Sequence, residues 1–169
     1  MHPATLPIEA LMADCQLRFT RRSGPGGQNR NKVETAVVVT HVPSGITAEA
    51  NERRSQHENR AVALFRLRVN LAITLRAGVN SPVTGQVGSP LWQTRCRGGR
   101  IQVNPTHDDF PALLAEALDT TWGAGFDLRV AAETLGCTSS QLVKFLQLEP
   151  RALAGVNAER ATRGLRKLM

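Results

Sequence analysis

The stretch from Arg21 to Lys32, RRSGPGGQNRNK, places three glycines and one glutamine between four cations. Gly24, Gly26 and Gly27 permit backbone conformations that other residues avoid, and they let the backbone approach another molecule closely. The N–H of Gln28 could then stabilise the oxyanion that develops on a carbonyl oxygen during hydrolysis. A wide turn between two strands, or a phosphate cradle, would use the same glycines. Neither a GxxxxGK[ST] string nor a strand, GxGxxG and helix in succession surrounds them, which disfavours the usual kinds of nucleotide site.

The charge of the chain indicates a polyanionic partner. Its 169 residues include 21 Lys and Arg against 14 Asp and Glu, a formal net charge of +7 with a pI near 10.6. Residues 1–80 carry 11 basic and 6 acidic side chains, residues 81–107 carry 3 and 0, residues 108–149 carry 2 and 7, and residues 150–169 carry 5 and 1. Nucleic acid is therefore the favoured partner.

Cysteine and histidine usage predicts a cytoplasmic protein without a metal. Cys15, Cys96 and Cys137 are odd in number and far apart, which fits neither a disulfide framework nor a CxxC metal site. The four histidines show no metal-ligand spacing. No run of about 18 apolar residues and no charged leader before an apolar core occurs, so we expect no membrane span and no secretion signal.

The elements around the glycine stretch are predicted to be a small sheet with a helix. Residues 16–20 alternate like a half-buried edge strand, and residues 34–42 are β-branched and apolar on both alternating sets, like an inner strand. A turn at 43–45 leads to a strand at 46–50, which makes a β-hairpin. From about 53 to 75 the apolar period is that of a helix.

The rest of the chain is predicted to be a linker and four helices. Residues 78–104 are rich in glycine and proline, although Trp92 is too large and apolar to be left free. Beyond them, residues 108–122, 127–136 and 138–148 show helix caps and periodicity, and a last basic helix is predicted from about Val156 to Lys167.

Three motifs in order resemble the class I peptide chain release factors. SGPGGQNRNKVETAV at 23–37 resembles the GGQ loop of that family, THVPSG at 40–45 its following turn, and RSQHENR at 54–60 the stretch that opens its helix. The resemblance covers roughly residues 15–76. Val33 departs from it, because relatives usually carry a small hydroxyl residue there, and this puts a hydrogen bond at the base of the loop in doubt.

The resemblance implies hydrolysis of the peptidyl-tRNA ester in the peptidyl transferase centre of the large ribosomal subunit. Gly26 and Gly27 resemble the flexible pair of the motif. Gln28 resembles the catalytic residue, with its backbone N–H facing the oxyanion and its side chain restricting the nucleophile to water. No metal or cofactor is implied. The other positions implied by the motifs are cations for ribosomal RNA, Arg21, Arg22, Arg30, Lys32 and Arg54, and supports of the loop, Ser23, Gly24, Asn31, Ser55, Gln56 and Asn59.

We therefore expect an α+β fold, with a small β-sheet, a GGQ loop and a covering helix, followed by a small all-helical C-terminal domain. The predicted boundaries are 1–77 for the catalytic domain, 78–104 for the linker and 105–169 for the helical domain. The expected partners are the large subunit with its ribosomal RNA and peptidyl-tRNA, without a membrane, and the protein is expected to act as a monomer. Methylation of Gln28 by a glutamine methyltransferase is left open.

A release factor that reads a stop codon needs a second domain for decoding. We expect no such domain before the loop, and on that expectation the sequence is similar to codon-independent proteins that rescue stalled ribosomes or freed large subunits. The main alternative is a non-catalytic ribosome- or RNA-binding regulator. Residues 127–147 also resemble a helix-turn-helix, with Gly136 in the turn and Leu142, Phe145 and Leu146 facing inward, which leaves a DNA-binding regulator as a third reading.

Overall fold

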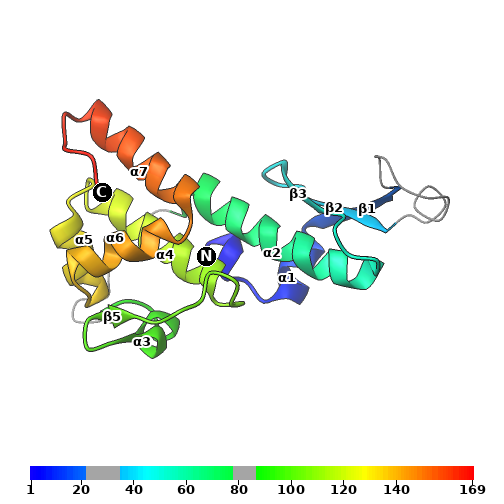
Figure 1. The fold of residues 1–169 in the computed structure, drawn as a ribbon, viewed down its shortest axis with the longest axis horizontal. Helices are drawn as coiled ribbons and strands as arrows, with labels where there is room; N and C mark the ends of the chain where they lie inside the picture. The colour runs from blue at the N-terminus through cyan, green and yellow to red at the C-terminus, as the bar shows by residue number, and fades with distance from the viewer. Residues whose placement is uncertain (22–34, 78–86) are drawn as a thin grey trace. The chain divides into compact units, whose positions relative to one another are not determined.

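The computed structural model describes residues 1–21, 35–77 and 87–169 (Figure 1). They form two compact units: a sheet unit, Leu6–Leu71, and a helical unit, Met1–Thr5 with Ala72–Met169. None of the helices in the described ranges combines the length and apolar character needed to cross a membrane.

The sheet unit is built on a three-stranded antiparallel sheet. Its strands are β1 (Cys15–Thr20), β2 (Ala36–His41) and β3 (Ile46–Ala50), in the order β1-β2-β3. The β-branched run of β2 occupies the centre of the sheet. Val37 and Val39, which point to the same face because side chains alternate along a strand, are fully buried. The predicted edge strand, inner strand and hairpin are confirmed.

The β2–β3 turn coincides with the THVPSG motif. Nδ1 of the buried His41 lies 2.7 Å from Oγ of Ser44, and the Gly45 N–H donates to the His41 carbonyl oxygen at 2.8 Å. Gly45 has a φ of 69°, a left-handed conformation that favours glycine. The motif therefore encodes a tight, side-chain-supported turn.

Two helices complete the sheet unit. Helix α1 (Ile8–Ala13) was not predicted; it buries Leu11 completely, and the residue after it, Asp14, accepts a backbone hydrogen bond from Val42 at 2.9 Å. Helix α2 (Gln56–Thr74) is the predicted covering helix and continues past the boundary between the units at Leu71.

The helical unit contains the predicted C-terminal helices: α4 (Phe110–Gly123), α5 (Leu128–Leu135), α6 (Ser139–Gln147) and α7 (Pro150–Thr162). Helices α5 and α6 form a helix-turn-helix. Gly136, at the C-cap of α5, has a φ of 65°, and Thr138 caps α6 by accepting from the Gln141 N–H at 3.3 Å. Leu142, Phe145 and Leu146 are buried, as predicted. The α+β fold class is confirmed.

The final helix begins earlier than predicted. Pro150 opens α7, six residues before Val156, and the helix ends at Thr162. Proline is well suited to the first turn of a helix, because the N–H that it lacks would have no partner there. The sequence prediction used Pro150 only as the end of the preceding helix.

The described part of the predicted linker is folded. Residues 87–104 contain α3 (Pro90–Arg95) and a hairpin of β4 (Cys96–Arg97) and β5 (Arg100–Ile101). Trp92 is 1% exposed, donates from Nε1 to the Leu135 carbonyl oxygen at 2.7 Å, and packs edge-on against Phe145 at 5.7 Å between ring centroids. Residues 78–86 lie outside the described residues, and the boundaries of the linker stay a prediction.

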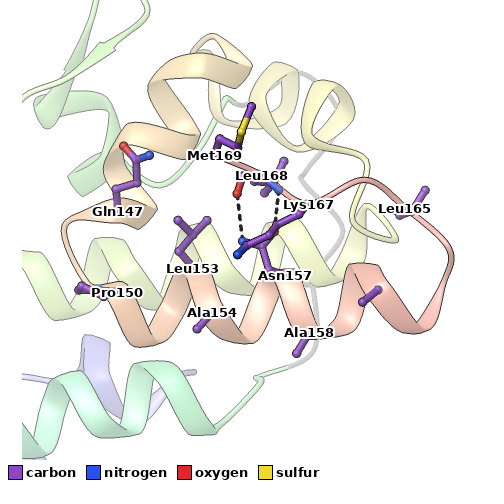
Figure 2. A pocket seen from close by; sticks show the side chains of 11 residues that line it. Gln147, Pro150, Leu153, Ala154, Asn157, Ala158, Leu165, Lys167, Leu168 and Met169 are labelled. Carbon is purple, nitrogen blue, oxygen red and sulfur yellow. Dashed lines mark hydrogen bonds between the residues drawn. The ribbon is translucent and has the colours of Figure 1, made fainter.

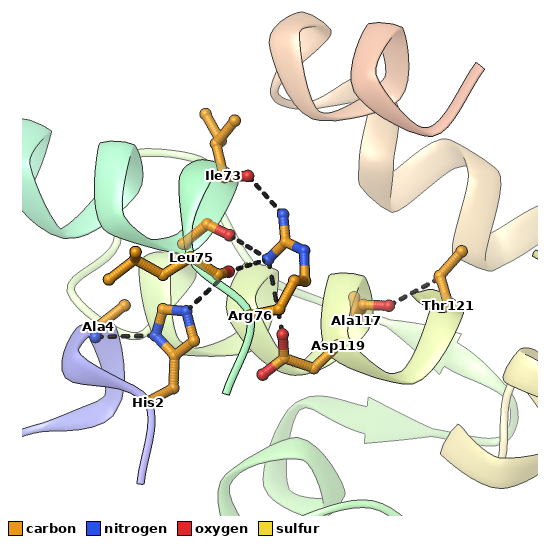
Figure 3. A network of polar contacts seen from close by, with 9 residues as sticks. His2, Ala4, Ile73, Leu75, Arg76, Ala117, Asp119 and Thr121 are labelled. Atoms are coloured by element: carbon orange, nitrogen blue, oxygen red, sulfur yellow. Dashed lines mark hydrogen bonds and ion pairs between the residues drawn. The ribbon is translucent and has the colours of Figure 1, made fainter. Parts of the chain in front are cut away.

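A polar network joins the first residues of the chain, the end of α2 and helix α4 (Figure 3). His2 lies before the short 3-10 helix η1 (Pro3–Thr5); its Nδ1 accepts from the Ala4 N–H at 3.0 Å, and its Nε2 lies 3.2 Å from the Leu75 carbonyl oxygen. Arg76 donates to the Ala72 carbonyl at 2.8 Å, pairs with Asp119 at 3.5 Å and stacks over Trp122 at 4.4 Å. The end of α2 is thereby fixed to α4.

Candidate functional site

The glycine-rich segment is bounded by the pairing of β1 with β2. Thr20, the last residue of β1, is the register partner of Ala36, the first residue of β2. The segment between them therefore leaves and returns at adjacent positions at one end of the sheet.

The predicted catalytic triplet lies outside the described residues. So do three of the predicted RNA-binding cations and three of the predicted loop supports. These residues are Gly26, Gly27, Gln28, Arg22, Arg30, Lys32, Ser23, Gly24 and Asn31. The described part of the site comprises Arg21, Arg54, Ser55, Gln56 and Asn59.

Asn59 is the central residue of the described part. It is fully buried on the first turn of α2, and its Nδ2 donates to the Thr35 carbonyl oxygen at 2.6 Å and to the Arg53 carbonyl oxygen at 3.0 Å. Its Oδ1 accepts from the Arg53 N–H at 2.9 Å. One side chain thus links the residue before β2, where the glycine-rich segment ends, to the chain that enters α2.

Ser55 and Gln56 begin the helix that carries Asn59. The Ser55 carbonyl accepts from the Asn59 N–H at 3.1 Å, and its Oγ lies 3.4 Å from the Glu58 N–H. This is the arrangement of an N-cap serine, which satisfies N–H groups left without partners in the first turn. The RSQ motif therefore sets where α2 starts and, through that start, where Asn59 lies.

Two predicted cations, Arg21 and Arg54, are exposed in the described structure. Arg21 directly follows β1, and Arg54 lies just before the first residue of α2. Arg21 lies where the glycine-rich segment leaves β1. Arg54 follows Arg53, which Asn59 links to Thr35 at the other end of that segment. Positive charge is therefore present at the base of the glycine-rich segment.

The prediction from sequence missed the contacts that fix α2 to β3. Arg66 donates to the Glu49 carbonyl at 2.8 Å and also pairs with the Glu52 carboxylate, and Nδ2 of Asn70 donates to the Thr47 carbonyl at 3.0 Å. The Arg66 hydrogen bond lowers the pKa of Glu52 to about 2. Arg66 and Asn70 are four residues apart, a spacing that places both on one face of a helix and could have indicated this role.

A groove lies in the helical unit along α7 (Figure 2). The chain turns back after Thr162, and Asn157 holds the returning tail by accepting from the Leu168 N–H at 2.7 Å and donating to the Leu168 carbonyl at 3.1 Å. The groove has a volume of about 910 Å³. Aliphatic side chains form much of its lining, among them Leu153, Ala154, Leu165 and Leu168.

Comparison with known proteins identifies the first half of the chain. The family model for the RF-1 domain matches residues 4–82. Peptide chain release factor 1 of Zymomonas mobilis is 35% identical over 131 residues, which cover 70% of this chain and 35% of the relative. Peptide chain release factor 1 of Acidiphilium cryptum is 47% identical over 70 residues, 41% of this chain and 20% of the relative. The chloroplastic peptide chain release factor PrfB1 of Arabidopsis thaliana is 48% identical over 66 residues, 39% and 14%.

The chain spans at most 35% of the length of these three relatives. The matched residues 4–82 include the sheet, the glycine-rich segment and α2. Residues 83–169, which form most of the helical unit, lie beyond the family match. The chain therefore carries a domain of the class I peptide chain release factor family.

Proposed function

We propose that this protein hydrolyses the ester bond of peptidyl-tRNA on the ribosome, without reading a stop codon. The observation that carries the proposal is the framing of residues 21–35, which contain Gly26, Gly27 and Gln28, by the paired ends of β1 and β2. The RF-1 match over residues 4–82 supports the chemistry, because its relatives are named peptide chain release factors.

In this proposal, water attacks the ester carbonyl carbon and the backbone N–H of Gln28 stabilises the resulting oxyanion. The bond to the ribose oxygen of the tRNA then breaks, that oxygen takes up a proton, and the peptide leaves as a carboxylic acid. One preorganised oxyanion donor contributes about 3 kcal/mol, or roughly a hundredfold in rate. Gly26 and Gly27 allow the close approach that a side chain would obstruct.

The described residues supply the support that such a loop requires. Asn59 holds the Thr35 carbonyl from a fully buried position, so the returning end of the segment is fixed to α2. A catalytic group must be held within a fraction of an ångström of its productive position. In the proposal, a fixed loop base limits the positions that the backbone N–H of Gln28 can take. Arg21 and Arg54 would contact ribosomal RNA phosphates at this base.

The codon-independent form of the proposal assigns no decoding role to the helical unit, most of which lies beyond the match to the RF-1 family model. The proposed partners are the large subunit and peptidyl-tRNA, with the protein acting as a monomer in the cytoplasm. Modification of Gln28 by a glutamine methyltransferase would appear as a mass increase of one methyl group on the peptide that contains it.

Peptide release from purified ribosomes tests the proposal. Ribosomes with labelled peptidyl-tRNA are prepared with a stop codon, with a sense codon and without a codon in the decoding site, beside isolated large subunits. We expect the protein to release peptide without a stop codon. Gln28→Pro, which removes the backbone N–H, and Gly27→Ala, which adds a side chain where close approach is needed, should lose release by about a hundredfold while still binding.

Release by both variants at the wild-type rate would remove the catalytic assignment. Binding of the wild-type protein without release would favour the non-catalytic RNA-binding regulator. Release only with a stop codon would contradict codon independence alone.

A further inference from the structure

The β4–β5 hairpin presents two arginines side by side. Arg97 and Arg100 are register partners, and the two residues between them, Gly98 and Gly99, have φ values of 56° and 73°. Two successive positive φ values are typical of the tight two-residue turn that matches the twist of a hairpin. Side chains directly opposite each other on a hairpin point to the same face, with Cβ atoms about 5 Å apart.

Neither of these arginines is neutralised within the part of the chain that the structure describes, and both are exposed. Like charges placed directly opposite each other destabilise a hairpin. Most other arginines of the helical unit have partners: a carboxylate for Arg76, Arg95, Arg129, Arg151 and Arg163, and backbone carbonyls for Arg160. The repulsion between Arg97 and Arg100 therefore destabilises the hairpin locally, and a bound external anion would remove this repulsion.

The hairpin is fixed beside the start of α6. A Cβ added to Gly99 would lie 3.9 Å from Cγ2 of Thr138, the N-cap residue of that helix. Arg95 holds the base of the hairpin, since its Nη2 pairs with Asp109 at 2.7 Å and its carbonyl accepts from the Gln102 N–H at 2.8 Å. The start of a helix carries partial positive charge, which adds to that of the two guanidinium groups.

Helix α6 itself contains no acidic residue, and its exposed residues include Ser140 and Lys144. Hydroxyl and ammonium groups are common ligands of backbone phosphates. The hairpin and the outer face of α6 therefore both offer groups that bind phosphate.

The acidic residues at 108–149 should repel a phosphate bound at the hairpin less strongly than their net charge indicates. Carboxylates of this segment are engaged by an arginine, by Ser89 or by the backbone N–H groups of a helix start, among them Asp109, Glu116, Asp119, Asp127, Glu133 and Glu149. The carboxylate at the base of the hairpin, Asp109, is the one paired with Arg95. The negative charge of Asp109 is therefore offset by a cation.

We propose that the β4–β5 hairpin, with the adjacent start of α6, binds the phosphate backbone of RNA. Paired guanidinium groups match phosphate oxygens in charge and in their forked hydrogen-bond geometry. The choice of RNA rests on the proposed function, because a protein that works on the large subunit meets ribosomal RNA across its surface. In that setting the hairpin is a second anchor, separate from the glycine-rich segment.

The test compares two double variants of the full chain that each remove two positive charges. Arg97→Gln with Arg100→Gln removes the hairpin pair, and Arg129→Gln with Arg151→Gln removes two exposed arginines that are already ion-paired. Binding to ribosomal RNA extracted from large subunits, and to an RNA and a DNA duplex of equal length, is measured between 50 and 200 mM salt. Tryptophan fluorescence melting checks folding.

We expect the hairpin variant to bind RNA more weakly, with a salt slope smaller by about 1.4 to 1.8 because two phosphate contacts are lost. The affinity of the wild-type protein should then fall about tenfold more than that of the variant over this salt range. The control variant should keep the wild-type slope. The melting temperature of the hairpin variant should be equal or higher, since the like-charge repulsion is removed.

An unchanged slope in the hairpin variant, or an equal loss in both variants, would overturn the proposal. Tighter binding of the DNA duplex than of the RNA duplex, lost in the hairpin variant, would overturn it in favour of DNA. These readouts need no peptide release. A failure of the proposed function, with Gln28→Pro still active, is thus distinguishable from a failure of the RNA surface.

Discussion

The buried side chain of Asn59 donates a hydrogen bond of 2.6 Å to the carbonyl oxygen of Thr35, 24 residues earlier in the chain. The same amide group accepts from the Arg53 N–H and donates to the Arg53 carbonyl. Three backbone groups thus depend on one side chain, and they belong to the two segments that meet at the base of the proposed catalytic loop. This relationship ties the stability of the sheet unit to the position of the loop.

Replacing Asn59 by alanine should destabilise the sheet unit and slow peptide release. Leaving a buried polar backbone group without a partner costs about 1 to 3 kcal/mol. Asn59→Ala removes the side-chain partner of three backbone groups in part-buried hydrogen bonds, so we expect a loss within that range. Hydrogen exchange should therefore become faster in β2 and at the start of α2, and release should fall at protein concentrations that saturate ribosome binding.

Asn70→Ala is the matched control for this change. Asn70 lies on the same helix and also donates from Nδ2 to a backbone carbonyl, that of Thr47, but it is only half-buried. We expect a smaller loss of stability and no effect on release. Equal effects of the two substitutions on release would contradict a specific role of Asn59 at the loop base.

Periodicity predicted the longer elements well, for a physical reason. The central strand, the hairpin and the helices α2, α4, α5 and α6 each bury one side or one face, so their apolar residues repeat with the period of the element. Helices α1 and α3 are six residues each, too short for two full turns, and no helical repeat can develop over that length.

The folded part of the predicted linker depends on contacts that are distant in sequence. The glycines at 98 and 99 contribute to the composition that predicts a linker, whereas in the structure they form the turn of a hairpin. Trp92 did indicate that some of this segment docks, and its partners, Leu135 and Phe145, lie over 40 residues away. No local pattern identifies such partners.

The candidate site was predictable only where a motif named its residues. Ser55 and Asn59 were placed as loop supports by resemblance, and their observed hydrogen bonds show what each can hold. The role of Gln28 and its neighbouring glycines stays a prediction. The opposed Arg97 and Arg100 could not be foreseen, because their pairing depends on a two-residue turn that the linker prediction excluded.

Substitution of Trp92 should unfold the helical unit selectively. Trp92→Ala removes a large buried side chain and is expected to cost about 3 to 5 kcal/mol. Both tryptophans of the chain, Trp92 and Trp122, lie in this unit, so the fluorescence of the remaining Trp122 reports on its unfolding alone. A denaturant titration followed by this fluorescence measures the change.

Trp92→Phe separates the hydrogen bond to Leu135 from the packing, and an intermediate loss of stability is expected. An unchanged midpoint in Trp92→Ala would show that residues 87–104 do not belong to the folded unit. Because Trp92 packs on residues beyond 107, a truncation at that point would expose it, and point variants are the cleaner probes of the helical unit.

The helical unit should lose stability as the pH falls below about 6.5. Burial lowers the pKa of His2 from its ordinary value of 6.5, and the neutral ring accepts from the Ala4 N–H through Nδ1. A histidine with a lowered folded-state pKa binds its proton more readily when unfolded, so its contribution is complete above pH 6.5 and is lost as the pH falls through the folded-state pKa.

The measurement compares wild type with His2→Gln, in which position 2 does not titrate. It follows the fluorescence of Trp92 and Trp122, both of which lie in the helical unit, in denaturant between about pH 7.5 and 5. The difference in unfolding free energy between the two proteins should shrink or reverse towards low pH. All other residues are identical in the two proteins, so the comparison isolates the contribution of position 2. A difference that is constant with pH would show that His2 is not buried in its neutral form.

The C-terminal tail should detach from α7 when Asn157 is replaced. Asn157 pairs with both the N–H and the carbonyl of Leu168, so its side chain recognises one residue of an extended backbone (Figure 2). Loss of two partly exposed hydrogen bonds should cost about 1 to 2 kcal/mol locally. Asn157→Ala should therefore speed hydrogen exchange and proteolysis in residues 163–169, while the unfolding midpoint measured by tryptophan fluorescence changes little. Asn157→Asp keeps the acceptor for the Leu168 N–H but loses the donor, and we expect exchange rates between those of wild type and alanine. If the tail of Asn157→Ala were as protected as that of the wild type, the aliphatic contacts of Leu165 and Leu168 along the groove would be its main attachment, and the asparagine would only set its register.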